Sequence, residues 1–171
     1  GDDYILFLGR LVPEKGVAEL IKAFRQVDTD KKLVIAGGSS DTQEYAQELV
    51  KLADGDERIL FTGFVQGRIL EELYSCAYVY CLPSRLEGMP LSLLEAMSYG
   101  CCCLTSDIPE CTSVVEDNAA TFALSEPDAL RASLQLLCDD TALVDRYRSN
   151  AADFICGKYC GKPVSNKNTC T

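Results

Sequence analysis

The sequence predicts an α/β fold in which helices cover both faces of a parallel sheet. Short apolar runs at residues 4–9 and 31–38 have the composition of strands that are buried on both faces. Between them, residues 17–24 place apolar side chains at the i, i+3, i+4 and i+7 spacing of one helix face. The 171 residues, 47% of them apolar and 25% charged, suit one globular domain with a sizeable core. Strands that alternate with helices in this way are typical of parallel sheets.

The remaining elements are expected from the same two patterns, in chain order. Apolar runs predict further strands at residues 58–63, 78–83, 100–106 and 120–123. Helical spacing predicts helices at residues 17–24, 41–53, 67–76, from Pro90 onward, and at 112–117, 127–140 and 141–156. Asp41 is the expected N-cap of its helix, and Leu70, Leu73 and Tyr74 are expected to face inward. We therefore expect a domain over residues 1–156 and a loosely ordered tail over 157–171.

The composition excludes several classes of function. A net charge of −10 with no histidine repels nucleic acid, so no nucleic-acid partner is expected. The ten cysteines form no C-x-x-C pair, which disfavours a zinc site. Cys101, Cys102 and Cys103 stand where a parallel strand carries Val or Ile, so we expect them in the core and the compartment to be the reducing cytosol. No apolar run approaches the ~18 residues of a membrane span, and no signal peptide opens the sequence.

Residues 82–105 carry the strongest chemical pattern. Glu87 and Gly88 follow a strand, and Pro90 suits the first position of the helix that comes next. The unpaired N–H groups and positive dipole end of that helix attract phosphate or carboxylate. Glu95 interrupts an otherwise apolar helix, and a carboxylate in such a place needs a partner. Two carboxylates on either side of the helix start could hold the hydroxyl groups of a ligand whose phosphates lie between them.

The segment P-S-x-x-E-G-M-P-L-S-L-L-E-A-M-S-Y-G, with its two glutamates separated by seven residues, resembles the retaining nucleotide-sugar glycosyltransferases of the GT-B fold, the glycosyl transferases group 1 family. The resemblance covers residues 4–155 and corresponds to the C-terminal, donor-binding half of such an enzyme. It implies a Rossmann-like parallel sheet. The donor is a nucleoside diphosphate sugar, with UDP and GDP types left open, and no cofactor is implied.

The resemblance also assigns roles to single residues. In G-R-L-V-P-E-K-G, Arg10 and Lys15 contact the donor diphosphate and stabilise the leaving group, and both follow a strand at the ligand edge of the sheet. Glu87 meets hydroxyls of the transferred sugar, and Glu95 binds the ribose. The other donor-binding positions lie in glycine-rich turns, the nucleobase turn and the helix start: Gly9, Gly37, Val65, Ser84, Gly88, Met89, Pro90 and Leu91.

Two patterns are interpreted as structural, and a third pattern is absent. Asp28-Thr29-Asp30 looks like a metal-binding Asp-x-Asp motif, but it lies between a helix and a strand and is interpreted as a turn, so no metal is expected. Phe61 and Phe64 are expected in the core rather than stacked on a base. The G-x-G-x-x-G pattern is absent after the first strand, which disfavours a nicotinamide-dependent dehydrogenase.

The resemblance implies metal-independent, retaining transfer of a hexosyl group. The acceptor is bound by an N-terminal domain outside this sequence, and the pathway is cell-surface polysaccharide or glycolipid synthesis. The expected location is the cytoplasm, with peripheral association at the inner face of the membrane through the missing half. Two alternatives stay open, a non-catalytic nucleotide-sugar binding module and a nucleotide-sugar epimerase of related fold. The family's C-terminal aromatic-x-Trp motif is missing, because the chain contains no Trp.

Overall fold

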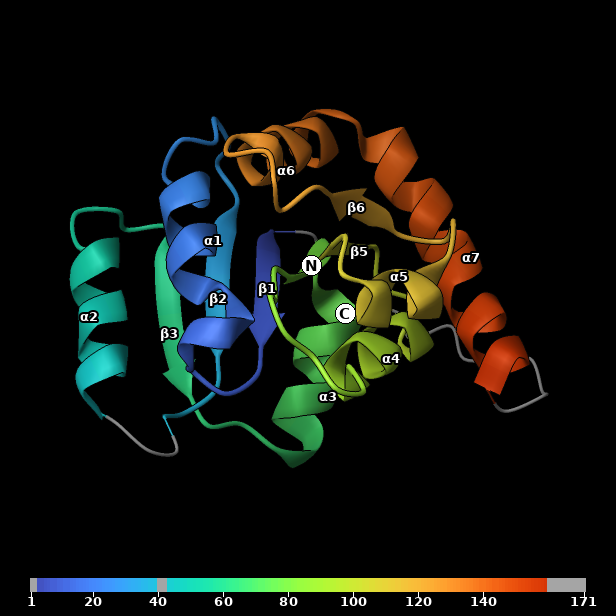
Figure 1. Ribbon diagram of the computed structural model, residues 1–171, viewed down its shortest axis with the longest axis horizontal. Coiled ribbons are helices and arrows are strands. Elements are labelled where there is room, and N and C mark those ends of the chain that lie inside the picture. Colours follow the sequence, from blue (N-terminus) through green and yellow to red (C-terminus); the bar gives the residue numbers. More distant parts are fainter. Residues whose placement is uncertain (1–2, 40–42, 160–171) are drawn as a thin grey trace.

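The protein was analysed as a computed structural model that describes residues 3–39 and 43–159. Within them a single parallel sheet has the strand order β3-β2-β1-β4-β5-β6 (Figure 1). Its strands are β1 (Tyr4–Leu8), β2 (Lys32–Ala36), β3 (Ile59–Gly63), β4 (Val79–Leu82), β5 (Cys103–Ser106) and β6 (Ala120–Phe122). This order confirms the predicted Rossmann-like α/β fold.

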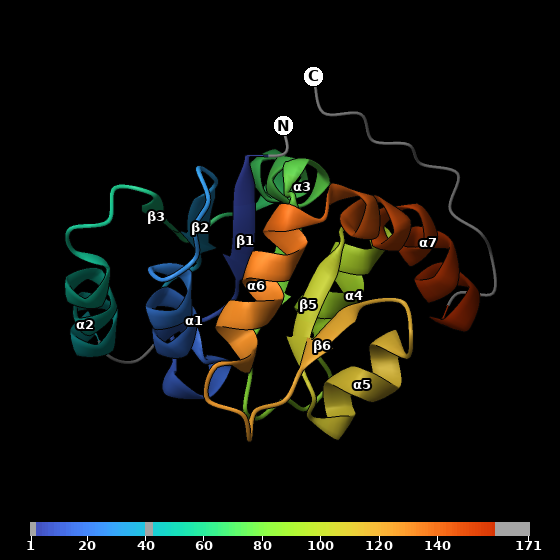
Figure 2. The ribbon, with the colours of Figure 1, turned by 90° about the horizontal axis from the view of Figure 1, so that it is seen from above.

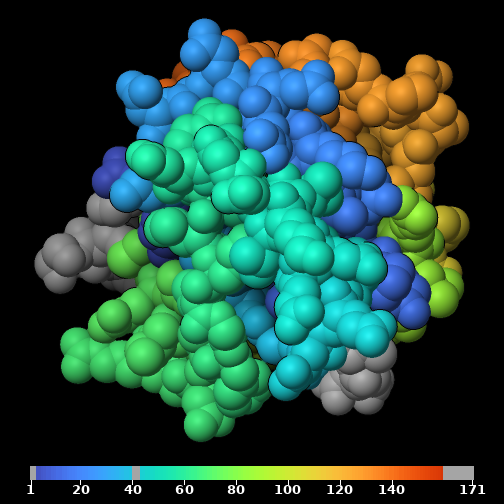
Figure 3. Space-filling view, turned by 90° about the vertical axis from the view of Figure 1, so that its left-hand side faces the viewer, coloured from blue at the N-terminus to red at the C-terminus, as the bar shows by residue number. Residues whose placement is uncertain are grey.

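Helices cover both faces of the sheet. One face carries α1, α2 and α6, which lie side by side, and the other carries α3 and α4, with α7 packed against α4 (Figure 2). Figure 3 shows the outer surface over α1 and α2. The helices are α1 (Val17–Phe24), α2 (Gln43–Ala53), α3 (Gly67–Cys76), α4 (Leu91–Ser98), α5 (Pro109–Val115), α6 (Ala129–Asp139) and α7 (Thr141–Tyr159). No helix in the described ranges is both long and apolar enough to cross a membrane.

Most predicted elements are confirmed, and the differences have local causes. A 3₁₀ turn, η1 (Pro13–Lys15), was not predicted; it begins at a proline and ends at Gly16, whose φ is 75°. The helix predicted at 112–117 instead spans Pro109–Val115, because Pro109 sets its first turn. Pro90 is the N-cap of α4 rather than its first residue. The last helix continues to Tyr159, while the predicted Asp41 cap and the segment 160–171 lie outside the described residues.

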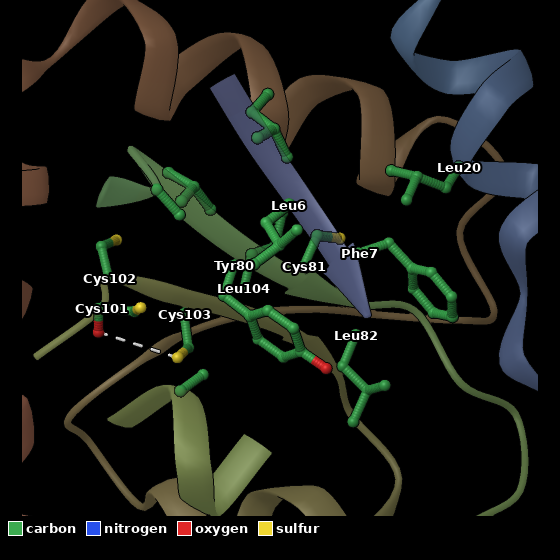
Figure 4. Close-up of a cluster of buried hydrophobic side chains, with 14 of the residues drawn as sticks. Leu6, Phe7, Leu20, Tyr80, Cys81, Leu82, Cys101, Cys102, Cys103 and Leu104 are labelled. Atoms are coloured by element: carbon green, nitrogen blue, oxygen red, sulfur yellow. Dashed lines mark hydrogen bonds between the residues drawn. The ribbon is translucent and has the colours of Figure 1, made fainter. Parts of the chain in front are cut away.

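The core lies along β1, β4 and β5, where almost every side chain is buried (Figure 4). Cys101, Cys102 and Cys103 are at most 2% exposed, which confirms their predicted place in the core. Burial disfavours a thiolate and raises the pKa of Cys101 and of Cys102 to about 12. These three thiols are free, whereas Cys76 is disulfide-bonded, which the expectation of a reducing compartment did not foresee.

The strand order places the expected ligand edge between β1 and β4. From β1 the chain builds outward through β2 and β3, and it then returns to add β4, β5 and β6 on the other side. In such sheets the loops after the two central strands diverge and leave a crevice at their carboxyl ends. The segments that follow β1 and β4 therefore border the candidate site.

Candidate functional site

The loops after β1 and β4 are locked together by close backbone contacts. Gly16 has a φ of 75°, and a Cβ added there would lie 2.1 Å from the carbonyl oxygen of Pro83. The N–H group of Arg85 donates to the carbonyl of Glu14 at 2.8 Å. Only glycine allows both this φ and this approach, so Gly16 fixes the position of the neighbouring Lys15 against the second loop.

Lys15 and Glu87 meet where these loops touch. The Lys15 Nζ atom lies 2.7 Å from Glu87 Oε1, and the side chains are 19% and 6% exposed. The Ser84 hydroxyl donates to the same oxygen, also at 2.7 Å. In the part of the chain that the structure describes, Glu87 Oε2 accepts no hydrogen bond, and every buried side-chain oxygen has a hydrogen-bond partner. Oε2 is therefore accessible to a ligand hydroxyl.

Ser84 supports Glu87 from the interior of the protein rather than lying on the surface. It is fully buried, its hydroxyl orients Glu87, and its carbonyl accepts a hydrogen bond from the Ser106 hydroxyl. The Thr105 hydroxyl donates to the carbonyl of Leu82 at 3.1 Å, one strand away. β5 thus anchors the end of β4, and Ser84, expected to bind donor, is placed to hold the carboxylate of Glu87.

A cavity of about 520 Å³ lies at the ends of β1 and β2 and beside the turn after β3. Four predicted residues line it together: Gly9, Arg10, Gly37 and Val65. Gly37 has a φ of 144°, and a Cβ there would lie 1.8 Å from the carbonyl oxygen of Gly9. The backbone therefore forms this wall at the closest approach that glycine allows. A second cavity, of about 390 Å³, lies between α1 and α6 and includes none of the predicted site residues.

Phe64 also lines the 520 Å³ cavity, and its predicted place in the core is wrong. Its side chain is 74% exposed, because it follows β3 in the turn that leads to α3. Phe61, inside β3, is partly buried and packs against the core as predicted. An exposed aromatic ring beside a cavity is suited to stacking on a flat ligand group.

Arg10 brings positive charge to the cavity. Its side chain is exposed, and no ion pair or hydrogen bond holds it within residues 3–39 and 43–159. A guanidinium group can bind phosphate oxygens in a bidentate manner, whereas the ammonium group of Lys15, paired with Glu87, would act as a point charge. The acidic protein therefore keeps cations at the edge where an anionic ligand needs them.

The start of α4 contributes backbone groups. Pro90 is buried at the N-cap position, while Gly88, Met89 and Leu91 are exposed. No side chain caps this helix, although the Leu91 N–H group donates to the Met89 carbonyl at 2.8 Å and the Leu93 N–H group to the Pro90 carbonyl at 3.1 Å. The positive dipole end of a helix favours a nearby anion.

The environment of Glu95 differs from the one expected from the sequence. It is exposed on α4 rather than buried among apolar side chains, so the desolvation argument for a partner is wrong. A partner exists nevertheless, because the Tyr74 hydroxyl donates to Glu95 Oε2 at 3.2 Å. Tyr74 was missed as a site residue. The sequence feature that could have identified it is its predicted inward orientation, because the hydroxyl of a buried tyrosine needs a hydrogen-bond acceptor.

In the described ranges no group of three or more His, Cys, Asp or Glu side chains is arranged to hold a metal ion. Asp28 and Asp30 follow α1 and precede β2, as expected for a turn.

Comparisons with known proteins identify the family and the fold. A sequence model described as "Glycosyl transferases group 1" matches residues 1–154. An uncharacterized glycosyltransferase of Methanocaldococcus jannaschii is 31% identical over 91% of this chain and 40% of its own length. The O-antigen chain mannosyltransferase B of Escherichia coli is 29% identical over 81% of this chain and 38% of its own.

Among solved structures, Anabaena HepE in complex with UDP and glucose superposes with a TM-score of 0.84 at 21% identity. The match covers 92% of this chain and 44% of that protein. The fold is therefore that of a GT-B glycosyltransferase domain, and the chain spans about two fifths of the curated relatives described above. Sequence model, relatives and fold lead to one conclusion: the chain belongs to the glycosyl transferases group 1 family.

Proposed function

We propose that this domain binds a nucleoside diphosphate sugar and forms the donor half of a retaining hexosyltransferase that needs no metal. The observation that carries the proposal is the Lys15–Glu87 pair. It joins a cation for phosphate to a carboxylate with one free oxygen for sugar hydroxyls. The uncapped start of α4 lies a few residues further along the same loop.

Each part of the donor has a partner of suitable chemistry. The nucleobase enters the 520 Å³ cavity beside Phe64 and Val65. The ribose hydroxyls meet Glu95. The diphosphate lies between Arg10, Lys15 and the first turn of α4, and the sugar meets Glu87. The base is not specified by this arrangement, since the turn at Val65 offers mainly backbone contacts.

The chemical demand of the transfer is to stabilise negative charge that builds on the leaving diphosphate. In many enzymes, fixed charges aimed at the position where charge develops lower the barrier more than any other effect. Arg10, Lys15 and the α4 dipole are three such groups. An acceptor hydroxyl attacks the anomeric carbon from the leaving-group face, and a β-phosphate oxygen takes its proton, so configuration is retained. No protein nucleophile is required.

The acceptor half lies in a longer protein. The matched relatives are more than twice as long as the match, which supports an N-terminal domain facing the donor edge of the sheet. The Escherichia coli relative's name supports transfer of sugars in cell-surface polysaccharide or glycolipid synthesis. We place the reaction in the cytoplasm, at the inner face of the membrane when the acceptor is a lipid.

Titration calorimetry tests the diphosphate site directly. A nucleoside diphosphate should bind at least tenfold more tightly than its monophosphate, a difference of about 1.4 kcal/mol. Arg10→Ala should remove most of that difference. Arg68→Ala is the matched control, since the Arg68 side chain is 88% exposed and forms an ion pair with Glu72 on the same helix. Equal binding of the two nucleotides by the wild type would contradict the proposal.

Turnover distinguishes the enzyme from a non-catalytic binding module. In the longer protein, Glu87→Ala should abolish sugar transfer while nucleoside diphosphate binding persists. Unchanged turnover in a correctly folded Glu87→Ala variant would refute the role proposed for Glu87.

A further inference from the structure

Tyr74 is a buried residue whose hydroxyl contacts Glu95, one of the candidate site residues. It lies on α3 and is fully buried. Its ring stacks on Tyr99, with centroids 5.3 Å apart and planes 9° from parallel, and it packs at a tilt against Tyr80 at 5.8 Å. A ring held on two sides by other rings has little freedom, so its hydroxyl has a fixed position.

The hydroxyl lies near two acceptors, both on α4. Glu95 Oε2 is 3.2 Å away and the Ser92 carbonyl is 3.4 Å away. The charged oxygen is nearer and accepts the stronger bond, since bonds to ionised acceptors are about twice as strong as neutral ones. Burial, with Glu95 next to it, raises the pKa of Tyr74 far above its usual range, so the phenol remains protonated and donates.

Glu95 depends on this contact. Its side chain is exposed, and within the described residues Tyr74 is the only hydrogen-bond donor to its carboxylate. An exposed glutamate samples several rotamers, and ordering it on ligand binding costs free energy. A bond from a rigid donor removes part of that cost in advance.

The helix that carries Glu95 is also held from the sheet. The hydroxyl of Tyr80, on β4, lies 2.7 Å from the Ser92 hydroxyl and 3.2 Å from the carbonyl of Leu8, a residue that lines the 520 Å³ cavity. Tyr80 therefore ties the first turn of α4 to the end of β1, and Tyr74 ties the Glu95 carboxylate to α3.

We propose that Tyr74 is a positioning residue that holds the Glu95 carboxylate ready for the ribose of the nucleotide and so makes the site select ribose over deoxyribose. This rests on the proposed function, because it gives Glu95 a nucleotide to meet. Tyr74 does not touch the ligand itself. It acts by holding Glu95 Oε2, so that Oε1, which accepts no hydrogen bond within the described residues, is left for the ribose.

The test is a ratio of affinities measured by calorimetry on the whole chain. The probes are UDP, GDP and ADP, and the 2′-deoxy form of whichever binds most tightly. Tyr74→Phe keeps the ring and removes only the hydroxyl. The matched control is Tyr78→Phe, since Tyr78 is also buried but its hydroxyl donates to the Leu137 carbonyl, on α6.

Tyr74→Phe should lower the ribose-to-deoxyribose affinity ratio about three- to tenfold, the effect of losing one hydrogen bond, whereas Tyr78→Phe should leave the ratio unchanged. Glu95→Gln should lower it further, and Tyr74→Phe added to Glu95→Gln should cause no additional loss. Thermal unfolding of the two Phe variants monitors stability separately, because a merely structural role would change stability and not the ratio.

Three outcomes would overturn the inference, and they are distinguishable. If Glu95→Gln lowers the ratio and Tyr74→Phe does not, Tyr74 has no positioning role while the proposed function stands. If Glu95→Gln leaves the ratio unchanged, Glu95 does not read the ribose. If the wild type binds none of the three diphosphates, the proposed function fails, and with it the ligand on which the inference depends.

Discussion

Lys15 and Glu87 are 72 positions apart in the sequence, and their side chains meet at 2.7 Å. The contact exists because β1 and β4 are neighbours in the sheet and the loops after them are joined at Gly16 and Pro83. It places a cation and a carboxylate at the edge where parallel sheets bind ligands. A ligand phosphate must compete with Glu87 for Lys15.

This competition makes a prediction for Glu87→Gln. Loss of the carboxylate releases Lys15, so a nucleoside diphosphate without sugar should bind as tightly as to the wild type or more tightly. The affinity for the sugar conjugate should fall about tenfold or more relative to the affinity for the sugar-free diphosphate, because hydrogen bonds to a charged acceptor contribute about 1.5–3 kcal/mol. Calorimetric titration of both ligands gives the ratio. Glu72→Gln, an exposed glutamate paired with Arg68, is the control, and an equal ratio in both variants would refute the role assigned to Glu87.

Gly37→Ala should destabilise the fold by more than about 2 kcal/mol and weaken binding in the cavity. Its Cβ would lie 1.8 Å from the Gly9 carbonyl oxygen at a φ of 144°, so both strands must move apart. Gly63→Ala is the matched control. Gly63 also has a positive φ, 74°, but its Cβ would meet nothing within 4 Å, so the expected loss is about 1 kcal/mol. Urea unfolding measures the free energy of unfolding of both variants. Similar losses of stability would show that the close approach of the strands is not needed.

The buried thiols predict loss of stability at alkaline pH. The folded state raises the pKa of Cys101 and of Cys102 from 9.0 to about 12, while the unfolded thiols ionise near 9. Below pH 9 both states hold these protons. Between about pH 9 and 12 the unfolded state binds fewer protons, so stability falls as pH rises, by about 1.4 kcal/mol per pH unit for each thiol.

Urea unfolding from pH 8 to 11 measures this slope. Cys102→Ala removes one titrating thiol and should make the decline shallower, whatever its effect on stability at pH 8. A slope unchanged in this variant would mean that Cys102 ionises normally in the folded protein.

Much of this fold could be predicted from local pattern. The four apolar positions of α1 are all buried, and α3 has the predicted bounds, because both helices have one strong apolar face. Cys101, Cys102 and Cys103 are buried like small apolar residues, as their place in an apolar run predicted. Pattern failed where single residues decide, as at Pro109, which moves α5 toward the N-terminus.

The site could be predicted in outline but not in its contacts. The positions of Gly9, Arg10, Gly37 and Val65 around one cavity follow from strand order alone. The exposure of Phe64 and Glu95 depends on how the turn after β3 and the helix α4 pack, and no local spacing encodes that. Tyr74 was predicted as inward-facing, but its bond to Glu95 joins two helices whose contact is a tertiary property.

The most direct test of the account is thermal unfolding of this chain with UDP, GDP and ADP, each beside its sugar conjugates. A ligand at 100 times its dissociation constant stabilises the native state by about 2.7 kcal/mol, which shifts a domain of this size by several degrees. We expect one diphosphate and its conjugates to raise the unfolding midpoint, Arg10→Ala to remove most of that rise, and Arg68→Ala to leave it unchanged. No shift at millimolar ligand, or an equal shift in Arg10→Ala, would contradict it.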